Sequence, residues 1–151
     1  KEFPIFNSSL INNDQIVLKE YINIGIAVDT EEGLVVPVIQ DADKLSLEEI
    51  SIKVKELAEK ARNKKLLNTS LENRTITISS LGKLGGIGFT PIINPPDVAI
   101  ISMSKTYKRL VLAEELDIMP IAMSYDHRVI NGADAGRFMV FLKDILDNFN
   151  D

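Results

Sequence analysis

The chain has no cysteine, and this absence narrows the chemistry open to it. Without a thiol, the 151 residues form no disulfide, offer no thiolate to a metal and hold no cysteine nucleophile. No apolar run approaches the roughly 20 residues that a membrane span needs, and no apolar signal region follows Lys1. We therefore expect a soluble protein of a reducing compartment, in which any thiol chemistry comes from the substrates.

Positive charge is also scarce. Lys and Arg number 17 against 22 Asp and Glu, so the net charge is -5, which argues against a surface that follows nucleic-acid phosphates. A small basic cluster at Lys105, Lys108 and Arg109 is interpreted as a solvated hairpin, although phosphate groups could use its charge. With 45% apolar and 26% charged residues, we expect one domain over residues 1–151.

Histidine occurs once, at His127. It follows an apolar segment, residues 118–123, that has the character of a strand, and it precedes apolar residues at helical spacing from Phe138 to Phe149. A turn between a strand and a helix often presents catalytic groups. Two interpretations are open at this point: His127 bonds a neighbouring backbone group, or it transfers protons, since an ordinary imidazole titrates near neutrality.

Apolar periodicity predicts a sheet accompanied by helices. We expect turns at residues 7–9 and 12–14, and a helix that starts at the capping box Ser46–Glu49 and runs to about Asn63. Strands are expected over 21–29, 34–39 (with Pro37 at an edge or bulge), 75–80, 98–102, 105–112 and 116–125, with a turn around 113–115 and a last helix over 134–148. Two to three helices flanking a mostly mixed sheet give an α/β or α+β sandwich.

Glycine is concentrated after the strand at 75–80, at Gly82, Gly85, Gly86 and Gly88. The spacing is neither that of a dinucleotide-binding loop nor that of a P-loop. We interpret this run as a close approach of the backbone to a neighbouring chain or to a substrate arm.

The segment 126–132, Asp-His-Arg-Val-Ile-Asn-Gly, resembles the signature of the dihydrolipoamide acyltransferases of 2-oxoacid dehydrogenase complexes and, more distantly, that of chloramphenicol acetyltransferase. The resemblance continues in order through 1–4, 23–28, 33–39, 75–82 and 89–96. It implies a chloramphenicol-acetyltransferase-like two-layer sandwich, with helices flanking a mixed sheet. It also implies that an N-terminal portion of the domain, a lipoyl domain and a partner-binding domain lie outside this segment.

The resemblance also implies a reaction, the exchange of an acyl group between dihydrolipoamide and coenzyme A. His127 would be the general base that ionises the attacking thiol, and Ser79 would donate a hydrogen bond to the oxyanion. Asn131 stands where many members have Asp; an amide can only hydrogen-bond, so we expect it to position the site. Asp126, Arg128 and Gly132 are expected to support the loop, and no metal is expected.

In the family, histidine and serine come from adjacent subunits of a trimer, and trimers build cubic or icosahedral cores. Residues 92–96 are interpreted as a patch between subunits, although a buried loop would have the same composition. Expected partners are the lipoyl domain and the dehydrogenase and dihydrolipoamide dehydrogenase components, in the cytoplasm or, in a eukaryote, the mitochondrial matrix. Lipoate is expected on another domain, because the triplet at 43–45 leads into a helix cap and not into a tight hairpin turn.

Two alternatives remain. The chain could be a catalytically silent scaffold of the same fold, or another coenzyme A-dependent acyltransferase of the superfamily that acts on a small alcohol or amine. Acyl selectivity and the size of the core, 24 or 60 subunits in family terms, are not readable from the sequence.

Overall fold

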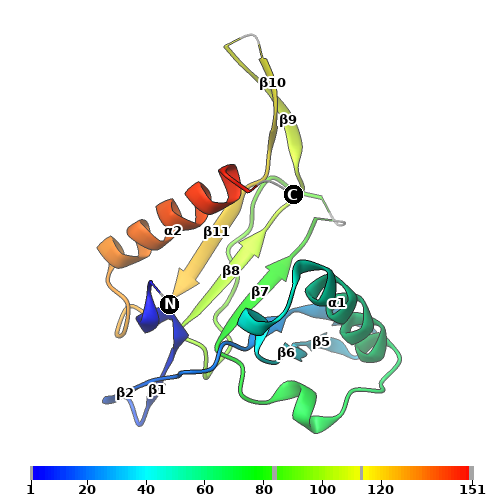
Figure 1. Ribbon diagram of the computed structural model, residues 1–151, viewed down its shortest axis with the longest axis vertical. Coiled ribbons are helices and arrows are strands. Elements are labelled where there is room, and N and C mark those ends of the chain that lie inside the picture. The colour runs from blue at the N-terminus through cyan, green and yellow to red at the C-terminus, as the bar shows by residue number, and fades with distance from the viewer. Residues whose placement is uncertain (1, 83–84, 113, 150–151) are drawn as a thin grey trace.

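A five-stranded mixed sheet organises the chain, whose computed structural model describes residues 2–82, 85–112 and 114–149. Its strands, in spatial order, are β11 (Ile121–Tyr125), β8 (Ala99–Met103), β7 (Ile76–Ser80), β3 (Ile24–Ile26) and β6 (Val38–Ile39). The three central strands are parallel to one another, and the two outer strands are antiparallel to their neighbours. Figure 1 shows the arrowhead of β11 pointing opposite to those of β8 and β7.

Three two-stranded ribbons accompany this sheet within the described residues. They are β1 (Ser8–Ile11) with β2 (Gln15–Leu18), β4 (Val28–Thr30) with β5 (Gly33–Val35), and β9 (Tyr107–Val111) with β10 (Glu114–Ile118). Short 3-10 helices occur at η1 (Pro4–Asn7), η2 (Ala42–Lys44) and η3 (Asn68–Leu71). The β9–β10 hairpin projects beyond the end of the sheet (Figure 1).

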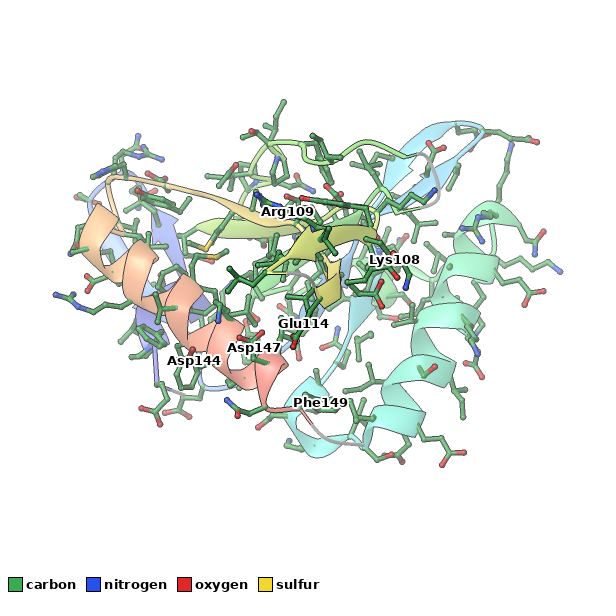
Figure 2. All side chains as sticks on the ribbon, turned by 90° about the horizontal axis from the view of Figure 1, so that it is seen from above. Lys108, Arg109, Glu114, Asp144, Asp147 and Phe149 are labelled. Carbon is green, nitrogen blue, oxygen red and sulfur yellow. The ribbon has the colours of Figure 1, made fainter. Side chains whose placement is uncertain are left out.

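Helices α1 (Leu47–Arg62) and α2 (Gly132–Asp147) cover one face of the sheet (Figures 1 and 2). The predicted capping box of α1 is confirmed, because the Ser46 hydroxyl accepts from the Glu49 N–H and the Glu49 carboxylate accepts from the Ser46 N–H. Beneath α2 lies the main apolar cluster, made of Phe6, Ile76, Val98, Ala99, Ile101, Ile130 and Ala135. The predicted two-layer architecture is therefore confirmed.

The other face of the sheet is polar and carries an extended segment, residues 85–97, which we call the strap. Hydroxyl groups on the sheet hold it: Ser102 donates to the Phe89 carbonyl oxygen at 3.1 Å, and Ser124 donates to that of Pro91 at 2.6 Å. Side-chain hydroxyls thus supply the hydrogen bonds that a further strand would have made with its backbone.

Several predicted strands are shorter than expected. The 21–29 strand ends at Ile26, and the chain then leaves the sheet to pair in β4. The 34–39 and 116–125 strands are each interrupted near a proline, Pro37 and Pro120, which have no N–H for the ladder. The turn predicted at 7–9 is wrong, since Ser8 and Ser9 begin β1, whereas the turn at 12–14 is confirmed. Ala113, in the predicted 113–115 turn, lies outside the described residues, and Glu114 and Glu115 belong to β10. Among the described residues, neither α1 nor α2 is long and apolar enough to cross a bilayer.

Candidate active site

His127 lies in a tight turn between β11 and α2. The turn is closed by the N–H groups of Val129 and Ile130, which donate to the Asp126 carbonyl oxygen at 3.0 and 2.9 Å. Ile130 is only 1% exposed and anchors the turn in the core. The position of the His127 backbone is therefore set by groups on both sides of it.

The imidazole itself is exposed and, among the described residues, makes no hydrogen bond or ion pair. Its one ring neighbour is Tyr125, with ring centroids 5.5 Å apart and planes inclined by 42°. The capping interpretation of His127 is thus not supported, and both ring nitrogens are free to meet a substrate.

Asp126 and Arg128, which precede and follow His127 in the sequence, form an ion pair with each other. The guanidinium donates to the carboxylate from Nε at 2.9 Å and from Nη2 at 2.6 Å, and the Arg128 backbone N–H donates to the same carboxylate at 3.0 Å. These hydrogen bonds lower the pKa of the Asp126 carboxyl, although its partial burial opposes them. The pair rigidifies the turn and leaves neither charge available for chemistry.

Asn131 is the N-cap of α2. Its carbonyl oxygen accepts from the Asp134 N–H at 2.9 Å, and its amide donates to the Asp134 carboxylate. The side chain therefore holds the start of the helix. Gly132 follows as the first helical residue, and a Cβ there would meet the Tyr125 hydroxyl at 3.6 Å, which is an ordinary contact.

Ser79 lies near the carboxyl end of β7, opposite Ser102 of β8. Side chains alternate along a strand, so Ser79 shares the strap face with Thr77, whereas Ser80 shares the helix face with Ile78. Ser80 accepts a weak hydrogen bond from the Gly82 N–H at 3.4 Å. The Ser79 hydroxyl, which is half-buried, has no hydrogen-bond partner among the described residues.

Within one chain, His127 and Ser79 lie at opposite ends of the sheet. Tyr125 pairs with Ala99 at the start of β8, whereas Ser79 pairs with Ser102 close to its end. With a rise of about 3.3 Å per residue and strands about 4.8 Å apart, the Cα atoms of His127 and Ser79 are separated by roughly 15 to 20 Å. The structure therefore does not bring the two predicted catalytic side chains together in a single chain.

A buried polar network that the sequence did not reveal lies beside the His127 turn. The Arg74 guanidinium donates to Asp97 at 2.9 and 3.0 Å and to the carbonyl oxygens of Asn94 and Pro95 at 3.0 and 2.7 Å. Thr77 donates to the same carboxylate. The network fixes the end of the strap next to Val98, whose carbonyl oxygen accepts from the Asp126 N–H at 2.8 Å.

The predicted basic cluster is exposed. Lys108 pairs with Glu115 across the hairpin at 3.0 Å, and both side chains are more than 60% exposed. Figure 2 looks down on the hairpin and shows Lys108 and Arg109 on opposite sides of it, so these two side chains do not form one basic patch. Lys44 lies in η2 beside the cap of α1 and pairs with Asp41 at 2.9 Å, an arrangement unlike a lipoyl hairpin.

The five-stranded mixed sheet with α1 and α2 on the same face is an arrangement also found in a solved acetyltransferase. A solved chloramphenicol acetyltransferase has the same fold, with a TM-score of 0.64 at 19% identity over 96% of this chain and 71% of that one. Residues 1–151 match the family described as 2-oxoacid dehydrogenases acyltransferase (catalytic domain). The chain belongs to this family.

Curated relatives agree. The chain is 48% identical over 151 residues to the dihydrolipoyllysine-residue acetyltransferase component of the pyruvate dehydrogenase complex of Pseudomonas aeruginosa, covering 97% of this chain and 28% of the relative. It is 41% identical over 153 residues to the succinyltransferase component of the 2-oxoglutarate dehydrogenase complex of Bacillus subtilis, covering 98% and 36%. The chain thus spans about a third or less of the length of these relatives.

Solved relatives share the architecture closely. One comes from a crystallographic and enzymatic investigation of the role of a serine, a histidine and an asparagine in the catalytic mechanism of Azotobacter vinelandii dihydrolipoamide acetyltransferase; its TM-score is 0.94 at 46% identity, over 97% of this chain and 63% of that one. Another is the cubic core of a pyruvate dehydrogenase multienzyme complex, with a TM-score of 0.94 at 47% identity, over 98% and 63%.

Proposed function

We propose that this chain is the catalytic core of an acyltransferase that exchanges an acyl group between coenzyme A and dihydrolipoamide. The observation that carries the proposal is the free imidazole of the only histidine, held on a rigid turn. The chain also belongs to a family whose members are named acetyltransferases and succinyltransferases, which supports acyl transfer as its reaction. In the Azotobacter relative the histidine and asparagine are four residues apart, as are His127 and Asn131.

The proposed reaction exchanges one thioester for another. His127 accepts the proton of the attacking thiol, whose ordinary pKa of about 8.5 lies only about two units above that of an ordinary imidazole. The thiolate attacks the thioester carbonyl, and the Ser79 hydroxyl donates to the oxyanion that forms. Collapse breaks the original carbon–sulfur bond, and the departing sulfur takes the proton back from His127.

We propose that His127 and Ser79 meet between two copies of the chain, since roughly 15 to 20 Å separate them within one copy. Each copy then supplies its histidine to one site and its serine to another. The trimer expected for the family satisfies this requirement, and the unpartnered Ser79 hydroxyl and His127 imidazole are both available to a neighbour.

The β9–β10 hairpin also supports self-association. It projects from the Ser79 end of the sheet (Figure 1), and among described residues its strands contact mainly each other. One side of the ribbon carries Tyr107, Val111, Leu116 and Ile118 together with the charged Arg109 and Glu114, and an isolated two-stranded ribbon is at best marginally stable in water. We propose that a second copy of this chain covers that side.

Lipoate, in this proposal, arrives on a separate domain, and the cubic core of the solved relative supports a larger assembly of trimers. The dehydrogenase components would join that assembly. The reaction needs free thiols, so a reducing compartment, the cytoplasm or the mitochondrial matrix, suits it. We expect acetyl-CoA to be a better donor than succinyl-CoA, because the acetyltransferase relative is more similar in sequence.

A mixing experiment with the full-length protein tests the proposal. Wild type should transfer acetyl groups from acetyl-CoA to dihydrolipoamide, and H127A and S79A should each be nearly inactive alone. When equal amounts are unfolded together and reassembled, about a quarter of the interfaces should pair an intact histidine with an intact serine, restoring about a quarter of wild-type activity.

Each other result has a distinct meaning. No transfer by wild type favours the silent scaffold, and transfer only to small alcohols or amines favours another superfamily activity. Activity of the wild type without any recovery in the mixture would overturn the shared site while leaving the reaction in place.

A further inference from the structure

A contact between two distant parts of the chain lies beside the proposed base. Asn13, at the tip of the β1–β2 hairpin, accepts a hydrogen bond through its amide oxygen from Nη1 of Arg128 at 2.7 Å. The two residues are 115 positions apart. Of the side-chain hydrogen bonds that reach the turn at 126–130 within the described residues, this one alone comes from outside the turn.

The backbone at the hairpin tip explains why asparagine is tolerated there. Asn12 and Asn13 both have left-handed φ angles, 53° and 65°, and the Asp14 N–H donates to the Ile11 carbonyl oxygen at 3.2 Å. Two left-handed central residues are typical of a hairpin turn that favours asparagine or glycine. Glycine would fit the backbone at either position, but at position 13 it would remove the side-chain oxygen that accepts from Arg128.

Arg128 divides its donors between two anchors. Nε and Nη2 bind Asp126, which belongs to the same turn, while Nη1 binds Asn13 on the other ribbon. Ile130 and the Asp126 N–H already anchor the turn to the core, but neither acts on the Arg128 side chain. Without Asn13, the guanidinium keeps only a partner two residues away; with Asn13, this exposed part of the turn is also tied to the β1–β2 ribbon.

The position of the turn determines that of the His127 imidazole, because among the described residues the imidazole has no hydrogen bond of its own. Its direction is therefore set by the backbone of the turn and by the Tyr125 ring. A base must be held close to the proton that it removes, and small misplacements lower the rate of the chemical step.

We propose that Asn13 is a positioning residue for acyl transfer, which acts by holding Arg128 and thereby fixing the turn that carries His127. This inference rests on the proposed function, but the contact itself concerns only the β1–β2 tip and the turn. It predicts a lower kcat with KM unchanged, since Asn13 acts on the base only through Arg128 and the turn.

The test compares N13G with N12G in the full-length assembled protein. Both substitutions keep a residue suited to a left-handed φ, and only N13G removes the acceptor of Arg128. We expect N13G to lower kcat roughly threefold to fivefold, as suits an exposed charge-assisted contact, with KM unchanged, and N12G to match wild type. N13D keeps an acceptor and should restore kcat.

Backbone hydrogen exchange provides a readout that does not depend on turnover. The peptide covering 126–131 should exchange several-fold faster in N13G than in N12G, whereas the α1 peptide should be unchanged in both. Equal kcat and equal exchange in N13G and N12G would overturn the inference. If the wild type transfers no acyl group, the proposed function fails, and unchanged exchange in N13G would separately refute the tie.

Discussion

Arg74 and Asp97 form an ion pair that is almost completely withdrawn from solvent. The Nε–Oδ1 distance is 2.9 Å, and 10% of the Arg74 side chain and none of the Asp97 side chain are exposed. The pair joins Arg74, which lies just before β7, to Asp97, the last residue of the strap. Because a buried charge without a partner is costly, the pair makes the strap and the sheet interdependent.

We expect R74M to destabilise the protein by about 3 to 5 kcal/mol, because it leaves the Asp97 carboxylate buried without its cation. The double variant R74M/D97L should recover much of that loss. Guanidinium chloride unfolding of the full-length protein measures both. The exposed pair Lys143–Asp147 is the matched control, and K143M should leave the unfolding midpoint unchanged. A loss in the double variant as large as in R74M would contradict the explanation.

Two carboxyls should give opposite pH signatures in stability. Burial raises the pKa of Asp97 above its ordinary 3.8, so its contribution to stability is present below 3.8 and is lost as the pH rises through the folded value. Hydrogen bonds from Arg128 lower the pKa of Asp126, so its contribution is present above 3.8 and is lost as the pH falls through the folded value.

Unfolding measurements from pH 3 to pH 6 check these signs. Relative to D97N, the wild type should gain stability as the pH falls. Relative to D126N, it should lose stability as the pH falls. The same slope for both comparisons would contradict at least one of the two assignments.

Ser79 and Ser80 allow a neighbouring-residue comparison for the oxyanion donor. S79A should lower kcat by about a hundredfold, the usual cost of removing one such donor. S80A should change kcat less than twofold, because its side chain lies on the helix face of β7. Steady-state acetyl transfer to dihydrolipoamide measures both, and a larger effect at Ser80 would reverse the assignment.

Asn131 should affect both the helix and the site. N131A removes the N-cap of α2 and should lower the free energy of unfolding by about 1 kcal/mol, while N131D keeps the cap oxygen but sets a carboxylate against that of Asp134 and should recover only part of the loss. S46A removes the corresponding cap of α1 and serves as the control. We expect kcat to fall in N131A but not in S46A. Equal activity in these two variants would reduce Asn131 to a helix cap alone.

The exposed side of the β9–β10 hairpin gives a prediction about assembly. L116E places a charge on the side proposed to meet a second copy, and it should shift the sedimenting species toward monomer and lower activity in parallel. K108Q alters the other side, where Lys108 already pairs with Glu115, and should leave assembly intact. Unchanged sedimentation of L116E would place the contact elsewhere.

The sequence predicted those elements whose formation depends on residues close together in the chain. The capping box at Ser46 and the alternation at 75–80 predicted α1 and β7 because caps and strand faces are set by neighbours in sequence. The His127 turn was found because the histidine is alone and follows a strand.

Long-range partners explain what the sequence did not reveal. Residues 116–125 look like one strand, but β10 pairs with β9 while β11 joins β8, and Pro120 separates them. Arg74 and Asp97 carry no signal in the sequence, since the burial of this ion pair depends on two segments 23 residues apart. The tie from Asn13 to Arg128 spans still more of the chain and leaves no local signal.

The strap lies on the sheet without forming a strand, because Ser102 and Ser124 supply its hydrogen bonds from their side chains. A hydroxyl satisfies a carbonyl oxygen whatever side chain the strap carries at that position. The route of the strap over the protein is therefore set by side chains of other segments, Ser102, Ser124 and Arg74, and not by its own exposed residues such as Ile87 and Ile92.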